Sequence, residues 1–244
     1  MTIHRNDDTT AERELVDHRP RSRSDASERP LDTRAWWRSW AIPLSVAVVA
    51  FLVYYIWPDY ISFDPAKAQI VLREGFAPHY TILVLHIVSG TVAIATLCLQ
   101  MWPWLRKRYP AIHRVSGQVY VFAGVVPTTL LIFALLGVAS VWNASTLGAV
   151  LLSTLWLSTT LLGFRTGRQR RYPEHRRWMI RSFALGIAIL WTRPTFTVAF
   201  AVPGWAGDLA VLQTVVGWAP WLLNLAIAEW WLYRTARRPE ALRA

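Results

Sequence analysis

The sequence contains little charge and almost no cysteine. Only 17% of its 244 residues are charged, whereas 54% are hydrophobic, and this balance is too apolar for a soluble domain. The single cysteine, Cys98, excludes an internal disulfide and lies in an apolar run, where a thiol packs as a small hydrophobic side chain. Zinc-protease, phosphate-loop and nucleophile-elbow motifs are also absent. Hydrolase and transferase chemistry therefore has no support, and a membrane oxidoreductase or electron-transfer protein is the enzyme class left open.

Acidic residues are scarce as well. Fifteen Asp and Glu face 26 Lys and Arg, for a net charge of +11. Such an excess can attract nucleic acid, but here the arginines alternate with apolar segments, as the positive-inside rule requires. The 15 tryptophans cluster at the ends of these segments, which is typical of aromatic belts at a membrane interface. We therefore expect a lipid bilayer, and no nucleic acid, as the partner.

Long apolar segments are what the chain has in abundance. They cover approximately 40–57, 80–102, 115–138, 145–164, 179–202 and 210–232. A bilayer core of about 30 Å needs about 20 helical residues, so each segment can span it. None alternates as the strands of a barrel do. The sequence predicts an all-α integral membrane protein with six transmembrane helices in residues 40–233, a disordered basic tail in 1–39 and a short basic tail in 234–244.

The connections between these segments differ in charge. Links two-to-three and four-to-five are rich in arginine, whereas the opposite connections carry only Lys67 and Arg73 as bases. Because basic loops stay on the cytoplasmic side, we expect both termini in the cytoplasm and the protein in the plasma (inner) membrane.

The two basic links repeat one pattern. Tyr109-Pro110-Ala111-Ile112-His113-Arg114 and Tyr172-Pro173-Glu174-His175-Arg176 have the same order of residue types, and each opens a long apolar segment. Internal repeats are common in membrane folds. The pattern predicts a four-helix core, spans two to five, built from two repeated hairpins, with spans one and six peripheral.

Small and polar residues recur along one face of most spans. His79, His86, Ala93 and Gln100 follow one another every seven residues on the second span. Such stripes favour helix packing, since small residues let helices approach and polar groups bond across the contact. They need no ligand.

Ionisable residues inside the spans have a separate interpretation, because a charge in the hydrocarbon costs at least about 2.5 kcal/mol. His86 and Arg193 each lie about seven residues, or roughly 10 Å, below the outer surface. We hypothesise a polar cavity lined by His86, Gln100 and Arg193, suited to a non-redox transporter or small-ligand-binding protein. The alternative is that Arg193 reaches outward to the interface and His86 donates to a backbone carbonyl. Glu229, near the inner end of the sixth span, is expected to pair with an inner arginine.

His113 and His175 begin two spans that run in the same direction, so they lie at one depth. Two imidazoles on facing helices suit a haem iron, and arginines suit the haem propionates. Arg114, Arg176 and Arg181 are the candidates for that role. The other interpretation is that both histidines cap their helices or contact lipid phosphate. A non-haem metal site would lack ligands, since Glu174 is the one further candidate.

Three blocks resemble a known family. They are the run from Leu85-His86-Ile87-Val88-Ser89-Gly90 to Gln100, the link Ile112-His113-Arg114-Val115-Ser116-Gly117-Gln118-Val119-Tyr120, and His175-Arg176-Arg177-Trp178-Met179-Ile180-Arg181-Ser182. Their order over about residues 80–200 is similar to bacterial predicted membrane proteins grouped as domain of unknown function 2306. The resemblance implies a multi-pass membrane protein and supplies no established activity.

The arrangement is also similar to cytochrome b561, a six-helix membrane protein with two haems between its four central helices. That similarity implies that His113 and His175 share one haem and that His86 matches the second-helix ligand of the other. The fourth span has no histidine, so the second haem lacks a ligand. The expectation is one haem b at the cytoplasmic end, with a quinone as candidate redox partner.

Overall fold

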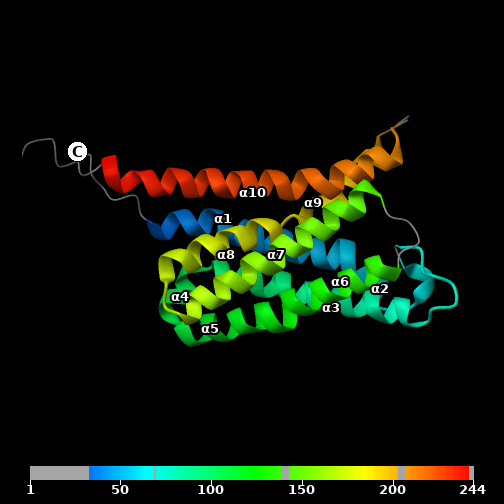
Figure 1. Ribbon diagram of the computed structural model, residues 1–244, viewed down its shortest axis with the longest axis horizontal. Coiled ribbons are helices and arrows are strands. Elements are labelled where there is room, and N and C mark those ends of the chain that lie inside the picture. The colour runs from blue at the N-terminus through cyan, green and yellow to red at the C-terminus, as the bar shows by residue number, and fades with distance from the viewer. Residues whose placement is uncertain (1–32, 69, 139–142, 203–206, 242–244) are drawn as a thin grey trace, which may run out of the picture. The chain divides into compact units, whose positions relative to one another are not determined.

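The computed structural model describes residues 33–68, 70–138, 143–202 and 207–241, without the side chains of 33–40, 193 and 237–241. The chain divides into two units, Met1–Trp36 and Trp37–Ala244. Nearly all of the described residues belong to the second unit, where helices are the regular structure (Figure 1). This confirms the predicted all-α class. Most of the predicted N-terminal tail, up to residue 32, lies outside the described residues, and helix α1 begins at Thr33.

Six helical stretches among the described residues are long and apolar enough to cross a membrane, as predicted. The first runs through α1 (Thr33–Phe51), the π-helix η2 (Leu52–Ile56) and α2 (Trp57–Tyr60), the second is α3 (Pro78–Met101), and the third joins α5 (Pro110–Val119), the π-helix η4 (Tyr120–Val125) and α6 (Val126–Val138). The fourth is α7 (Ala144–Arg168), the fifth joins α8 (Tyr172–Gly186) and α9 (Ile189–Ala201), and the sixth is α10 (Leu209–Ala241). Two short helices, η3 (Pro65–Lys67) and α4 (Pro103–Arg108), lie in connections.

The third and fifth spans begin earlier than the apolar runs predict. Pro110 and Pro173 occupy the first turns of α5 and α8, where the missing proline N–H costs nothing. The helices therefore start inside the basic links. As a result, His113 and His175 lie in the first turns of helices.

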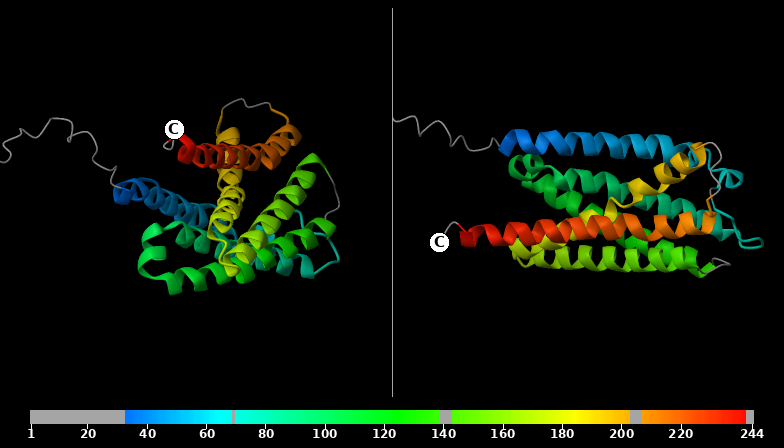
Figure 2. Two further views of the ribbon diagram at one scale, coloured as in Figure 1. Left: turned by 60° about the vertical axis from the view of Figure 1, so that its left-hand side comes forward. Right: turned by 90° about the horizontal axis from the view of Figure 1, so that it is seen from above.

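The four middle spans form the core of the second unit. Spans two and three pack together, spans four and five pack together, and α10 packs on α7 and α8 (Figures 1 and 2). The buried share of the most apolar stretch is 17% in span one and 11% in span six, against 24–39% in the others. Spans one and six are therefore peripheral. The repeat relation between the two hairpins stays a prediction.

Glycines permit the closest helix contacts. A Cβ placed on Gly124 of η4 would lie 2.8 Å from Cα of Ala93 on α3, and one on Gly148 of α7 would lie 2.7 Å from the carbonyl oxygen of Gly217 on α10. The neighbour is backbone in both cases, so no side-chain rotation can make room. These two contacts fix how closely the hairpin of spans two and three closes and how closely α10 approaches.

The fifth span is broken between α8 and α9. Ala188 N–H donates to the carbonyl of Leu185 (3.2 Å) instead of that of Ala184, four residues back. The Asn224 side chain of α10 donates to the Ala184 carbonyl at 3.1 Å. A side chain of the sixth span therefore satisfies a backbone acceptor that the break exposes, as a membrane interior demands.

Arg170 ends α7 in a left-handed conformation, with φ of 59°. Arg170 N–H donates to Gly167 (3.1 Å) and Arg171 N–H to Thr166 (2.9 Å), which is the Schellman pattern that usually has glycine at this position. We expect Arg170→Gly to stabilise the protein by about 1 kcal/mol, because a left-handed non-glycine residue costs about 1–2 kcal/mol. Denaturant unfolding in detergent measures it. Arg168→Gly, inside the last turn of α7, is the control and should destabilise by about 1 kcal/mol; equal effects at the two positions would contradict the assignment.

Candidate functional site

Basic side chains crowd one end of the second unit, where α3 and α7 end and α5 and α8 begin; we call it the basic end. Its exposed bases are Arg106, Lys107, Arg108, Arg114, Arg165, Arg168, Arg170, Arg171, Arg176 and Arg177. Glu174 is the acidic residue of these links, and its carboxylate pairs with Arg171 at 2.5 Å. The histidines of both links lie at this end.

His175 is held in a defined orientation by α7. Its Nδ1 lies 2.7 Å from the carbonyl oxygen of Gly163. A carbonyl only accepts, so Nδ1 carries the proton and Nε2 of the neutral ring keeps its lone pair. Gly167 gives the ring room, since a Cβ there would lie 2.9 Å from Nδ1. A ring N–H bonded to a backbone carbonyl is how metal-binding histidines are usually oriented.

His113 is half-buried in the first turn of α5 and lies near His175, Arg106 and Arg114. Its Nδ1 is buried and finds no hydrogen-bond partner among the described residues. Leaving such an atom unpaired costs about 1–3 kcal/mol. The imidazole of His113 therefore has a ring nitrogen to offer to a ligand.

Gln100 anchors this end of α3 to α5. Its Nε2 donates to the backbone carbonyl of His113 (3.0 Å) and to Oγ of Ser116 (2.6 Å). His86 lies 14 residues, or about 21 Å, before Gln100 on α3. The structure therefore brings Gln100 to His113 and not to His86.

His86 is bonded to the third span. Its Nδ1 lies 2.9 Å from the carbonyl oxygen of Thr128 and 3.1 Å from the Thr128 hydroxyl. The Thr128 hydroxyl also donates to the His86 carbonyl at 3.1 Å. This is the backbone-carbonyl contact that the sequence left as the alternative to a cavity. The side chain of Arg193 lies outside the described residues.

Of the candidate propionate ligands, Arg114 and Arg176 are exposed at the basic end. Arg181 is engaged elsewhere, because its Nε and Nη2 donate to the two carboxylate oxygens of Glu229 on α10 at 2.5 and 2.9 Å. Its guanidinium also lies 4.9 Å from the ring centroid of Trp178. The expected pairing of Glu229 with an inner arginine thus occupies Arg181.

A buried hydrogen-bonded cluster lies seven residues beyond His113 on the third span. The Tyr120 hydroxyl is 2.7 Å from Oγ of Ser182, which is 2.7 Å from Oγ1 of Thr160, and Trp156 Nε1 donates to the Tyr120 hydroxyl at 3.0 Å. Tyr120, Thr160 and Ser182 are fully buried. The four side chains come from three helices, and no sequence signal joins them. The cluster links the third, fourth and fifth spans inside the core.

No group of three or more His, Cys, Asp or Glu side chains that could hold a metal ion occurs among the described residues. A metal centre built from protein ligands alone is therefore not visible in this part of the chain. What the described residues do offer is two imidazoles at one end of the core.

Comparison with known proteins identifies a family. The family model described as "Predicted membrane protein (DUF2306)" matches residues 83–232, which is more than half of the chain. No curated protein and no solved structure matches. The resemblance of the three sequence blocks to this family is confirmed. The comparisons do not show the similarity to cytochrome b561.

Proposed function

The chain belongs to the predicted membrane protein family DUF2306, and from that premise we propose that it binds one b-type haem for membrane electron transfer. His113 and His175 would hold the haem iron. In this proposal the basic end faces the cytoplasm and the protein lies in the plasma (inner) membrane. The observation that carries the proposal is the pair of half-buried imidazoles. One has its Nδ1 bonded to a backbone carbonyl, and the other has a buried Nδ1 without a partner among the described residues.

The donor set fits a haem better than a bare metal ion. The ring of a haem would supply most of the iron's ligands, so two histidines of the protein would suffice to hold it. Each propionate needs a cation with N–H donors, and Arg114 and Arg176 are the exposed candidates nearest the two histidines in sequence. Arg181 is left out of the proposed site because Glu229 holds it.

When bound, the haem would carry single electrons by cycling between ferric and ferrous iron. The chain's own residues hold and orient the ligands. The Gly163 carbonyl sets the tautomer of His175, and Gln100 fixes the turn that carries His113. The cluster around Tyr120 links the spans that carry both histidines. A quinone dissolved in the bilayer is the proposed redox partner.

The orientation of the protein is part of the proposal. The basic end carries nearly all the loop arginines, whereas the described connections at the opposite end carry Lys67 and Arg73 beside four acidic residues, Asp59, Asp64, Glu74 and Asp208. This asymmetry supports a cytoplasmic basic end and cytoplasmic termini.

A variant series tests the haem ligands. With the protein expressed in the presence of ample haem, His113→Ala and His175→Ala should each lose the Soret band, because each removes an axial ligand. His86→Ala should keep it, since His86 is bonded to Thr128. Absorption spectra after size-exclusion chromatography make the measurement on folded protein only. A full Soret band in His113→Ala or His175→Ala, or its loss in His86→Ala, would place the haem elsewhere.

The alternative function was a non-redox transporter or small-ligand-binding protein with a cavity around His86 and Arg193. No contact among the described residues favours it, because Thr128 takes the Nδ1 of His86 and Gln100 lies at the other end of α3.

A further inference from the structure

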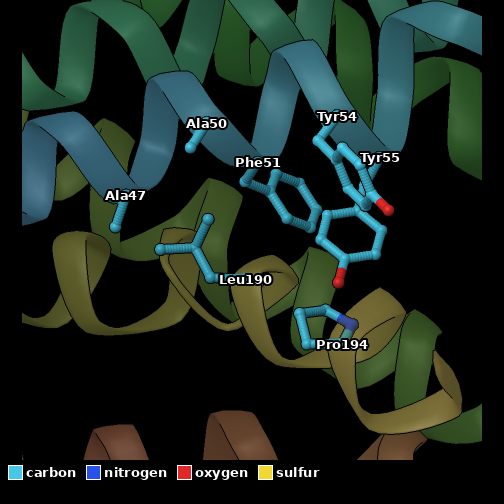
Figure 3. A pocket seen from close by; sticks show the side chains of 7 residues that line it. All are labelled: Ala47, Ala50, Phe51, Tyr54, Tyr55, Leu190 and Pro194. Atoms are coloured by element: carbon cyan, nitrogen blue, oxygen red, sulfur yellow. The ribbon is translucent and has the colours of Figure 1, made fainter. Parts of the chain in front are cut away.

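A groove lies between the first span and α9, far from the two histidines in sequence. It has a volume of about 320 Å³, and its lining residues are Ala47, Ala50, Phe51, Tyr54, Tyr55, Leu190 and Pro194. Figure 3 shows the rings of Phe51, Tyr54 and Tyr55 gathered beside Pro194. Phe51 is midway along its span. The groove therefore extends from the middle of the bilayer toward the end of the protein opposite the basic end.

Both walls of the groove are irregular helix. Tyr54 and Tyr55 stand on the π-helix η2, just before Pro58. The other wall, α9, follows the break in the fifth span and contains Pro194, which has no N–H to donate to the Leu190 carbonyl four residues back. Single π-helical turns occur often at functional sites, and irregular backbone at membrane depth is tolerated where it lines a cavity or is buried in protein.

The lining is apolar carbon with a few neutral polar groups. The Tyr54 and Tyr55 rings meet edge to face at 4.9 Å, and Phe51 and Tyr55 lie 5.7 Å apart, which forms an aromatic wall. The phenol hydroxyls of Tyr54 and Tyr55 are the side-chain polar groups of the lining, and no lining residue is charged. Such a site favours a neutral flat ring with oxygen substituents and disfavours an ion.

Size and access narrow the ligand further. Ligand pockets usually span about 300–1,000 Å³, so a groove of about 320 Å³ accepts one ring and excludes a macrocycle. The Tyr54 side of the groove opens laterally, since this residue is 72% exposed on the lipid-facing surface. A ligand with an apolar tail can enter from the bilayer and leave its tail there.

We propose that this groove binds the ring of an isoprenoid quinone or quinol. Quinone oxygens accept hydrogen bonds from the Tyr54 and Tyr55 hydroxyls. The choice of a quinone over other neutral ring lipids rests on the proposed function, which needs a redox partner soluble in the bilayer. Binding itself requires no haem.

The experiment uses the full chain in lipid nanodiscs and a photoreactive azidoquinone with a short isoprenoid tail. Mass spectrometry should locate the label on η2 or α9. The double variant Tyr54→Phe/Tyr55→Phe should weaken binding about tenfold, because it removes two neutral hydrogen bonds. Ala50→Trp should fill the groove and abolish labelling. Tyr233→Phe is the matched control, since Tyr233 is an exposed tyrosine outside the groove, and it should bind as the wild type does.

Two results would overturn the inference. One is a label that maps to other helices. The other is that an isoprenoid-tailed benzene without ring oxygens binds as tightly as the quinone and that the double variant does not weaken quinone binding. The groove would then only pack lipid chains. The Soret band reports on the haem, and the labelling reports on the quinone site. If the protein lacks a Soret band but is still labelled at η2, the proposed haem function is wrong and the quinone site stands. If the protein has a Soret band but is not labelled at η2 or α9, the quinone site is wrong and the haem function stands.

Discussion

Replacing Gly124 with leucine should dismantle the helical core, whereas the same replacement at Gly137 should not. A Cβ on Gly124 would lie 2.8 Å from Cα and 2.9 Å from Cβ of Ala93. Because Ala93 Cα belongs to the α3 backbone, the whole contact between α3 and η4 must open to admit a side chain. Overpacking costs about 1–3 kcal/mol and occasionally more, and with a full leucine at a backbone contact we expect a loss of at least about 3 kcal/mol.

Gly137 is the matched control because it lies on the same span and, among the described residues, no atom lies within 4 Å of its Cβ position. Leucine there should be neutral or favourable, since glycine inside a helix is about 0.8–1.0 kcal/mol less favourable than alanine. Helix content followed by circular dichroism during SDS unfolding, together with size-exclusion profiles, compares the two variants. If both lie within about 0.5 kcal/mol of each other, the close contact does not set the core.

The second large effect concerns the ion pair between Arg181 and Glu229. Arg181 lies two residues into the apolar segment that begins at residue 179, near the inner end of the fifth span. Its guanidinium is bound at both oxygens of Glu229. Glu229→Leu leaves that cation without its partner, and a lone arginine costs about 2.5–3.5 kcal/mol at the centre of a span and less near its end. We therefore expect a destabilisation of about 2 kcal/mol.

The double variant Arg181→Leu/Glu229→Leu should recover most of that loss, since replacing both ions with apolar side chains is often neutral. Glu174→Leu is the control for an exposed pair. It removes the partner of Arg171 at the basic end, where the pair is open to water, and should change stability by less than about 1 kcal/mol. SDS unfolding midpoints make this comparison. A double variant as unstable as Glu229→Leu would show that the pair does more than cancel charge.

The sequence predicts the large features of this fold because they depend on length and charge alone. Runs of about 20 apolar residues predict the six spans, and the repeated basic links predict that spans two to five are central. The apolar segments begin at 115 and 179, whereas the helices begin earlier, at Pro110 and Tyr172. Arginines indicate that a segment lies outside the hydrocarbon. A helix can nevertheless continue past the membrane surface as long as its backbone hydrogen bonds continue.

The candidate site was only partly predictable. That His113 and His175 share one depth follows from topology, because both begin spans of the same direction. The tautomer of His175 depends on Gly163, 12 residues away on another helix. The place of Gln100 was missed for a related reason: its seven-residue spacing from His86 puts both on one face, but spacing does not say which part of that face meets which neighbour.

The haem content of the purified protein tests the central proposal most directly. Total haem, measured as its pyridine complex, is divided by the amount of chain after expression with ample haem. One haem per chain is the expected value, because His113 and His175 form one pair and the fourth span offers no histidine opposite His86. A value near zero would contradict the assignment of the histidine pair, and a value near two would contradict the single site.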